Sequence, residues 1–419
     1  MPTLVNTLLS YLSNTDTIRE RILELQTAMT ALPALGPENF PEGTLCAGER
    51  PKANYLLGEL KRMGFTDIES IDAPDARTED GTRPNIAAKI AGKSGRTLWL
   101  IGHMDVVATG DLEYWNTDPW TVHVDENNDD IIYGRGVEDN QQGIVSGLLA
   151  AEALLASGQT PEIGLGLLFV ADEETGNLFG IDHIMKVRSD LFAKDDIIVV
   201  PDCGNYAGTM LEVAEKGILW LKVQVTGKQC HASTPDKGIN SLEAASAMIV
   251  RVRELYDVFP EQNPIFSPPT STFSATKKEA NVSSVNIIPG SDVFYIDCRI
   301  LPCYNLDAVR AAAQSIADQV AAAYNVTIEL TDVQTEPAAP ATPVDSDVVT
   351  KLSAAITSVT GETAIPMGIG GGTVAAFLRH RGLQAAVWGK LIPNAHTPNE
   401  HSRISATVDE AKVFVSMLG

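Results

Sequence analysis

The sequence predicts an α/β protein with a mostly parallel central sheet and an inserted, ferredoxin-like α+β domain. Short apolar runs alternate with helical patterns from residue 85 onward, as in α/β units. Around residues 212–333 this texture changes to a β-α-β-β-α-β order. At 419 residues the chain also exceeds the size at which one hydrophobic core keeps growing, so two domains are expected.

The first domain begins with an amphipathic helix, because apolar residues between 18 and 32 recur at steps of four and three. Another helical pattern covers 55–63. The strands are predicted at 85–90, 98–101, 164–171 and 197–200, with a helix at 143–155. Strands that are separated by helices of this length indicate a largely parallel sheet. In such sheets ligands bind at the carboxyl ends of the strands.

The inserted domain is predicted from a second set of elements. Its strands are expected at 219–225, 281–288, 293–300 and 326–331, and its helices at 241–256 and 306–324. Residues 332–343 are rich in Ala and Pro and are predicted to be a linker back to the first domain, where 346–359 resumes a helix. We therefore divide the chain into a first domain, 1–211 and 334–419, and an inserted domain, 212–333.

The composition excludes several classes of protein. A hydrophobic content of 44% with 20% charged residues is ordinary for a globular enzyme. The formal net charge of −23 argues against a nucleic-acid partner and against an anionic membrane surface. No stretch offers the roughly 18 consecutive apolar residues of a membrane span, and no signal peptide is predicted. The five scattered cysteines favour reduced thiols, so we expect a soluble, cytoplasmic protein.

Histidine and carboxylate side chains follow the predicted strands. His103 and Asp105 come directly after the strand at 98–101. Residues two apart in an extended chain project the same way, so Asp105 can orient the ring of His103 while the other ring nitrogen meets a metal. The alternative is a strand-end histidine that is paired with a carboxylate for solubility.

Carboxylates at three further places in the chain stand at the end of a predicted strand or in the turn before a helix. Asp139 lies in the turn before a helix, where an N-cap is the commoner role. Asp172, Glu173 and Glu174 follow a buried strand, and a nearby cation is the simplest relief for their mutual repulsion. Asp202 ends another strand.

Two histidines lie close together near the C-terminus, and a surface position is the alternative for each of them. Together the clusters place His, Asp, Glu, Asp and His around one rim of one sheet, the N/O ligand set of a zinc site with open positions. The candidate metal ligands are His103, Asp139, Glu174, Asp202 and His396.

The motifs occur in a specific order along the chain: GHMDVV, YGRGVED, FVADEETG, VVPD, KQCHASTPDKG and AHTPNE. In these motifs, over nearly its whole length, the sequence resembles a family of dinuclear zinc metallopeptidases and deacylases. That family includes aminoacylase, glutamate carboxypeptidase, acetylornithine deacetylase and succinyl-diaminopimelate desuccinylase. The resemblance implies a catalytic metal-binding first domain and an inserted dimerisation or lid domain.

The resemblance also implies roles for the ligand candidates. Asp139 resembles the carboxylate that bridges two divalent ions, with zinc expected first and cobalt or manganese as alternatives. His103 and Asp202 would complete one metal site, and Glu174 and His396 the other. The AHTPNE frame selects His396 over His401.

Further roles concern catalysis and the substrate. Glu173 resembles the general base, Asp105 the partner of His103, and His231 the histidine that one subunit of a homodimer donates to the other subunit's active site. The residues implied in binding a substrate carboxylate are Asn286, Arg299, Gly371, Gly372 and Thr373. A guanidinium fits a carboxylate bidentately and a glycine-rich turn presents N–H groups, although a sheet-edge ion pair and a plain loop are the alternatives.

Elementary chemistry agrees with these roles. Two cations about 3.5–4 Å apart lower the pKa of a shared water and polarise a scissile carbonyl. Glu173 would take the proton of that water and deliver it to the leaving amine. A donor such as His231 is most useful where it stabilises a developing oxyanion.

The chain departs from its relatives at three places. Asn140-Gln141-Gln142 stands where many have a lysine, and Val374 where many have an aspartate. Glu215-Lys216 replaces an arginine pair of the desuccinylases, which disfavours a substrate with a second carboxylate.

We therefore expect metal-dependent hydrolysis of an N-acyl amino acid or short peptide with a free carboxylate. Cleavage of another linear C–N bond, as in a ureido acid, and a catalytically silent dimeric binding protein are the alternatives.

Overall fold

The computed structural model describes residues 3–419, which form two compact units. Unit 1 comprises residues 3–213, Thr342–Met367 and Thr373–Gly419, and unit 2 comprises Ala214–Ala341 and Gly368–Gly372. Unit 2 extends further along the chain than the predicted 212–333 because strand β16 (Thr327–Glu336) pairs with β11 (Gly217–Thr226) as far as Glu336. The first residues of the predicted linker are therefore strand.

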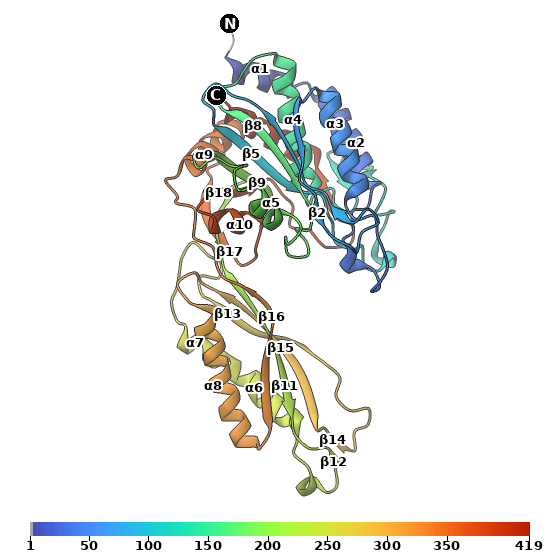
Figure 1. Ribbon diagram of the computed structural model, residues 1–419, viewed down its shortest axis with the longest axis vertical. Coiled ribbons are helices and arrows are strands. Elements are labelled where there is room, and N and C mark those ends of the chain that lie inside the picture. The colour runs from blue at the N-terminus through green and yellow to red at the C-terminus, as the bar shows by residue number, and fades with distance from the viewer. Residues whose placement is uncertain (1–2) are drawn as a thin grey trace. The chain divides into compact units, whose positions relative to one another are not determined.

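Unit 1 is built on an eight-stranded sheet within the described residues, in the order β1-β4-β8-β5-β9-β18-β10-β17 (Figure 1). In chain order these strands are β1 (Asp67–Ser70), β4 (Ile86–Ile90), β5 (Thr97–His103), β8 (Gly164–Val170), β9 (Ile197–Gly204), β10 (Met210–Glu215), β17 (Ile365–Ile369) and β18 (Ala385–Gly389). The central strands β8, β5, β9 and β18 run parallel to one another. On one side β4 is antiparallel to β8 and β1 is antiparallel to β4, and on the other side β10 is antiparallel to β18. The predicted α/β class with a mostly parallel sheet is confirmed.

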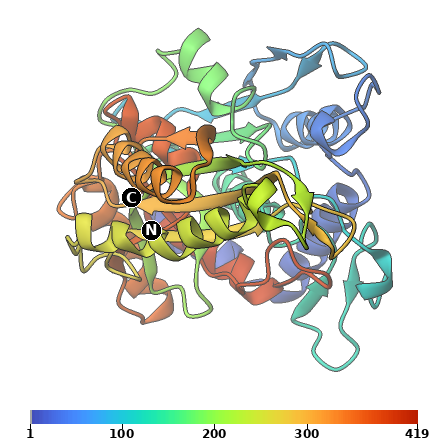
Figure 2. The ribbon, with the colours of Figure 1, turned by 90° about the horizontal axis from the view of Figure 1, so that it is seen from below.

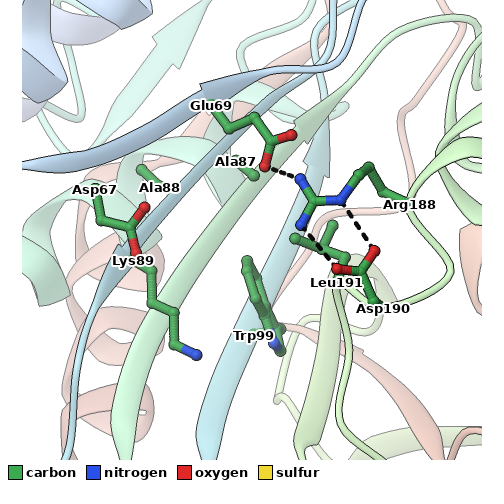
Figure 3. Close-up of a pocket in the computed structure, with 9 residues that line it drawn as sticks. All are labelled: Asp67, Glu69, Ala87, Ala88, Lys89, Trp99, Arg188, Asp190 and Leu191. Carbon is green, nitrogen blue, oxygen red and sulfur yellow. Dashed lines mark hydrogen bonds and ion pairs between the residues drawn. The ribbon is translucent and has the colours of Figure 1, made fainter.

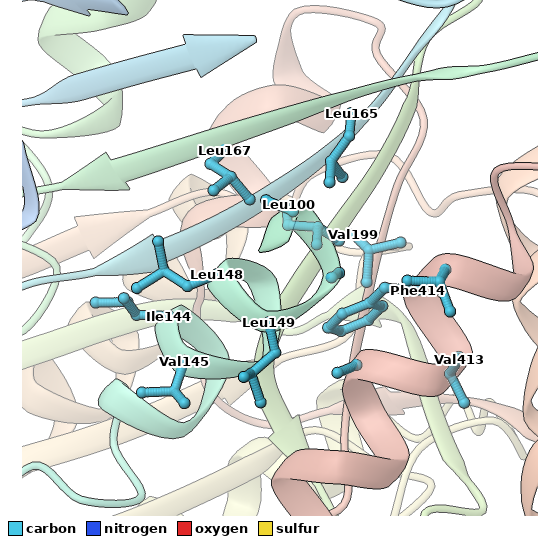
Figure 4. Packing of buried hydrophobic residues seen from close by; sticks show 14 of the residues in the cluster. Leu100, Ile144, Val145, Leu148, Leu149, Leu165, Leu167, Val199, Val413 and Phe414 are labelled. Atoms are coloured by element: carbon cyan, nitrogen blue, oxygen red, sulfur yellow. The ribbon is translucent and has the colours of Figure 1, made fainter. Parts of the chain in front are cut away.

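Helix α4 (Gln141–Ser157) anchors one face of this sheet. It is apolar all round and almost entirely buried, as expected of a helix enclosed on every side. Its side chains Ile144 and Leu148 pack towards Leu100 and Leu167 of the sheet, and α11 (Ile404–Ser416) adds Phe414 to the same core (Figure 4). This packing fixes the end of α4 that follows Asp139.

The remaining helices complete the two layers. Trp99 and Val387 face the opposite side, where α5 (Ile181–Val187) and α10 (Val374–His380) cover the sheet. The other helices of unit 1 are α1 (Leu4–Tyr11), α2 (Thr15–Thr30), α3 (Arg50–Met63) and α9 (Asp347–Thr360). Its short strands are β2 (Ala73–Pro74), β3 (Thr82–Arg83), β6 (His123–Val124), β7 (Ile131–Tyr133) and β19 (His401–Arg403). No helix in the described part of the chain is long and apolar enough to cross a membrane.

Unit 2 contains a four-stranded antiparallel sheet in the order β13-β15-β11-β16. Helices α6 (Ser241–Arg251) and α8 (Leu306–Tyr324) lie side by side and bury alternate residues of the sheet, such as Leu219 and Leu221 (Figures 1 and 2). The remaining elements are β12 (Cys230–His231), α7 (Leu255–Val258), β13 (Thr272–Lys278), β14 (Ile287–Ile288) and β15 (Ser291–Ile300). The predicted ferredoxin-like order is confirmed.

One predicted strand of unit 2 was misplaced. Residues 281–288 were expected to form it, but only β14, at their end, is extended, and it pairs with β12 in a separate ribbon. The strand is instead β13, which pairs with β15. Residues 281–288 contain four β-branched apolar residues, as a strand often does, yet Val285 is fully exposed and Asn281 donates its side-chain amide to Asp292.

Candidate metal centre

Three of the five candidate ligands, and Glu173, come from the carboxyl ends of neighbouring parallel strands. His103 is the last residue of β5, Asp202 lies near the end of β9, and Glu173 and Glu174 follow β8. Because β8, β5 and β9 are adjacent and parallel, their carboxyl ends meet at one edge of the sheet.

Asp139 connects the two imidazoles of the cluster. Its Oδ1 lies 2.9 Å from Nε2 of His103, and its Oδ2 lies 3.1 Å from Nε2 of His396. Burial alone raises the pKa of Asp139, but the hydrogen bonds and charges of the two histidines outweigh burial and hold the pKa well below its usual range. Each oxygen of one carboxylate therefore faces a different ring.

The other carboxylates divide between these two histidines. Asp202 Oδ1 is 3.5 Å from Nε2 of His103, and Glu174 Oε2 is 3.0 Å from Nε2 of His396. One possible ligand atom from each of His103, Asp139 and Glu174 lies within 4.8 Å of the others, and the same holds for His103, Glu173 and Asp202. The structure thus brings all five predicted ligands, and Glu173, into one cluster.

The charges of the cluster are unbalanced. Burial, and next the charge of Asp202, raises the pKa of Glu173 well above its usual value. Burial likewise raises the pKa of Glu174 to about 7. Hydrogen bonds to Asp139 and Glu174 raise the pKa of His396 to about 10. Carboxylates that crowd together in this way favour a bound cation, and a donor set of imidazole nitrogen and carboxylate oxygen fits a divalent ion such as zinc.

Asp105 orders both the ring of His103 and the chain that carries the glutamates. Its carboxylate accepts hydrogen bonds from the backbone N–H groups of Glu173 (3.1 Å) and Glu174 (3.0 Å). His103 Nδ1 lies 3.0 Å from the main-chain oxygen of Asp105 and 3.6 Å from its carboxylate. The nearer partner of the ring is therefore the carbonyl, and donation from Nδ1 would leave the Nε2 lone pair available to a metal ion.

No sequence pattern indicated the role of Asn140. Its side-chain amide donates to the main-chain oxygen of Pro201 (2.6 Å) and to Asp202 (2.9 Å), and its Oδ1 accepts from the backbone N–H of His103 (3.2 Å). The peptide bond between Asp139 and Asn140 is cis. The buried side-chain amide of Asn140 thus connects its own segment, which carries Asp139, to the segments that carry Asp202 and His103.

A buried ionic group supports the Glu173 segment from behind. Arg83 is fully buried and forms ion pairs with Glu49 and, at 3.0 Å, with Asp172. Asp172 has a left-handed backbone with φ 64°, and its Oδ2 accepts from the backbone N–H of Phe179 at 2.9 Å. These bonds hold the turn in a conformation that a non-glycine residue rarely adopts.

His401 lies apart from these contacts. It belongs to β19, its Nδ1 is 3.0 Å from the main-chain oxygen of Asn399, and its ring contacts Tyr133. A recess of about 220 Å³ elsewhere in unit 1 contains Arg188, bound by Glu69 and Asp190 (Figure 3). The guanidinium of Arg188 is thus already paired with two carboxylates.

The candidate residues of unit 2 form two local groups. His231 is exposed on β12, and its Nδ1 accepts from the backbone N–H of Ser233 at 3.1 Å. Asn286 lies across the same ribbon, where its main-chain oxygen accepts from Ala232. Arg299 is held by Asp297 through both carboxylate oxygens.

The second group includes the glycine turn. Arg299 Nη1 donates to the main-chain oxygen of Gly370 at 3.0 Å. Gly371 and Gly372 follow in the same turn, and Thr373 caps α10 of unit 1 by accepting from Ala375 N at 3.1 Å. Arg299 thus forms an ion pair, as in the alternative to substrate binding, but β15 is an interior strand and not a sheet edge.

The Glu215-Lys216 pair is buried. Lys216 Nζ donates to the main-chain oxygens of Pro268 (2.9 Å) and Thr270 (2.7 Å), and burial lowers its pKa. Its ammonium group is thus engaged by the backbone of unit 2.

Comparisons with known proteins agree with this fold. Residues 99–419 match the model of peptidase family M20/M25/M40. An uncharacterized metallohydrolase of Methanococcus maripaludis is 38% identical over 88% of this chain and 93% of its own length. A succinyl-diaminopimelate desuccinylase of Acinetobacter baylyi is 24% identical over 96% and 98%. Human carnosine dipeptidase 1 has a similar structure, with TM-score 0.77 and 17% identity over 100% and 98% of the two chains.

These findings define a metal-dependent amidohydrolase with an α/β fold. The chain belongs to peptidase family M20/M25/M40.

Proposed function

We propose that this protein uses two divalent metal ions to hydrolyse the amide bond of an N-acyl amino acid or a short peptide with a free carboxylate. The observation that carries this proposal is the position of Asp139, whose two oxygens each face a different histidine. A carboxylate in that position suits a bridge between two ions, because each oxygen has a separate nitrogen ligand beside it.

The ligands divide into two sets that share Asp139. His103 and Asp202 complete one set, and Glu174 and His396 complete the other. Zinc is the proposed ion, since imidazole nitrogen and carboxylate oxygen are its usual ligands, with cobalt or manganese as substitutes. Bound ions at such a site supply Lewis acidity and make water acidic enough to attack near neutral pH.

Glu173 is the proposed general base. It would accept a proton from the attacking water and return that proton to the leaving amine. Burial and neighbouring carboxylates raise its pKa, which suits a group that must both take and release a proton near neutral pH. Asp105 serves as the positioning residue that holds its backbone.

Unit 2 supplies the proposed contacts to the substrate. Arg299 already binds one carboxylate with its fork, that of Asp297, so its geometry suits the carboxylate of a substrate. Asn286 and the turn of Gly371 and Gly372 would share this task, together with Thr373 of unit 1. His231 would donate to the developing oxyanion in the partner subunit of a homodimer, a role that suits its exposed position on β12.

The names of two similar proteins support an acylated amino acid or a peptide as the substrate class. One relative bears the name of a desuccinylase, and one structural neighbour that of a dipeptidase. Lys216 is held by backbone oxygens, which supports the expectation that a second substrate carboxylate is not bound there.

The experiment is turnover of a panel of N-acyl amino acids and dipeptides by the metal-free protein and by the protein loaded with Zn²⁺ or Co²⁺. We expect metal-dependent hydrolysis, and Glu173→Gln should abolish it while the metal content stays that of the wild type. Absence of metal-dependent turnover across the panel would refute the proposal. If Glu173→Gln loses metal as well, Glu173 is a ligand and not the base.

Dimerisation has a separate test. Light scattering should give the mass of a dimer. A monomer that is fully active would refute the proposed role of His231 across the dimer.

A further inference from the structure

Two segments of unit 1 that carry proposed ligands are tied together by two buried glutamates that belong to opposite segments. The first segment, residues 135–139, ends at Asp139, and the second, residues 392–400, carries His396. We propose that Glu138 and Glu400 form a reciprocal clamp that sets the position of His396 relative to Asp139 and thereby the affinity of the metal position that these two residues share. The inference rests on the proposed dinuclear function.

Glu400 clamps the Asp139 segment from the His396 segment. Its Oε1 accepts hydrogen bonds from the backbone N–H groups of Glu138 and Asp139, both at 3.1 Å. Its Oε2 accepts from the backbone N–H of Gly136 at 3.0 Å and from Arg135 Nη1 at 2.7 Å. Glu400 is buried, so its carboxylate is stable only because these donors replace water.

Glu138 makes the reverse connection. It is also buried, and its Oε1 accepts from the backbone N–H of Ile392, at the start of the His396 segment. The His396 segment is therefore held at both ends, by Glu138 at Ile392 and through Glu400 at its other end. These bonds join residues more than 250 positions apart in the chain.

His396 needs such support because its own surroundings are open. Its side chain is 56% exposed, and its backbone is left-handed with φ 64°. Within the loop, the side chain of Asn394 closes the turn, with its Oδ1 accepting from the backbone N–H of His401 at 3.0 Å and its amide donating to the main-chain oxygen of His401 at 2.9 Å. The loop is thus a preformed unit whose placement depends on its two ends.

The substitution Glu400→Gln tests the first half of the clamp. Both oxygens of the Glu400 carboxylate accept hydrogen bonds from N–H groups. A glutamine keeps one oxygen and replaces the other with an NH₂ group, which cannot accept, so in either orientation some of these N–H groups lose their acceptor. Glu138→Gln keeps a carbonyl acceptor for Ile392, whereas Glu138→Ala removes it. Glu212→Gln is the matched control, because Glu212 is a fully buried glutamate of unit 1 that is bound by Arg379 through both oxygens.

The measurement is titration of the metal-free full-length proteins with Zn²⁺ and with Co²⁺ by calorimetry, beside their thermal unfolding without metal. We expect Glu400→Gln and Glu138→Ala to weaken one metal equivalent by about 10–100-fold, the usual effect of removing a partner that orients a ligand. Glu138→Gln should bind both equivalents as the wild type does. Glu212→Gln should unfold at a lower temperature and bind metal normally.

Two results would overturn the clamp. Wild-type metal affinity in both Glu400→Gln and Glu138→Ala would show that the glutamates only stabilise the fold, and an equal loss in Glu212→Gln would show that any destabilisation weakens binding. If Glu400→Gln does not fold, the contrast between Glu138→Ala and Glu138→Gln decides. Failure of the wild type to bind two equivalents would instead refute the dinuclear function.

Discussion

The substitution Asp105→Asn removes one of two hydrogen bonds that hold the proposed base and ligand in place. The Asp105 carboxylate accepts from the backbone N–H of Glu173 at 3.1 Å and from that of Glu174 at 3.0 Å. An asparagine retains one oxygen acceptor and presents an NH₂ group to the other N–H. Loss of one bond to a charged, buried acceptor costs about 1.5–3 kcal/mol, which corresponds to a loss of about 10–150-fold at 1.36 kcal/mol per tenfold.

The assay for this substitution is kcat of the metal-saturated protein together with metal affinity. We expect one or both to fall within that range. Asp196→Asn is the matched control, because Asp196 accepts from the backbone N–H of Thr97 (2.8 Å) at the other end of β5, the strand that ends at His103. It should lower stability and leave kcat unchanged. The reasoning fails if Asp105→Asn retains wild-type kcat and metal affinity, or if Asp196→Asn loses as much.

Two further predictions concern stability. Leu148→Ala removes a fully buried side chain between α4 and the sheet. It should lower the free energy of unfolding, measured by urea denaturation, by about 2–5 kcal/mol. A loss below about 1 kcal/mol, as is usual for a surface substitution, would contradict the packing. The pKa of Glu410 is raised from 4.5 to about 7, first by burial, so its native state keeps a proton that the unfolded chain releases, and stability should fall as the pH rises from about 4.5 to about 7. Glu410→Gln should flatten that part of the stability profile, and an unchanged slope would refute the assignment.

The clustering of three candidate ligands was predictable because parallel strands place their carboxyl ends at one edge. His103, Glu174 and Asp202 each follow an apolar run, and those runs became β5, β8 and β9. Asp139 lacked such a signal, since an aspartate before a helix reads equally well as an N-cap. In the structure the residue at the cap position is Asn140, and Asp139 is free to face the two histidines.

The supporting residues were not predictable in the same way. Asn140, Glu138 and Glu400 act through backbone groups that lie far away in the sequence, and no local pattern records such contacts. The strand β13 was missed for a related reason. Its residues are mostly exposed, so it lacks the alternation of a half-buried strand, and only its pairing with β15 defines it.

The most direct test of the shared aspartate is calorimetric titration of metal-free wild type, Asp139→Ala, His103→Ala and His396→Ala with Zn²⁺. The wild type should bind two equivalents. Asp139→Ala should weaken both of them, whereas each histidine variant should weaken chiefly one, because Asp139 faces both rings and each ring faces a different set of ligands. An Asp139→Ala protein that keeps one equivalent at wild-type affinity would contradict the bridge.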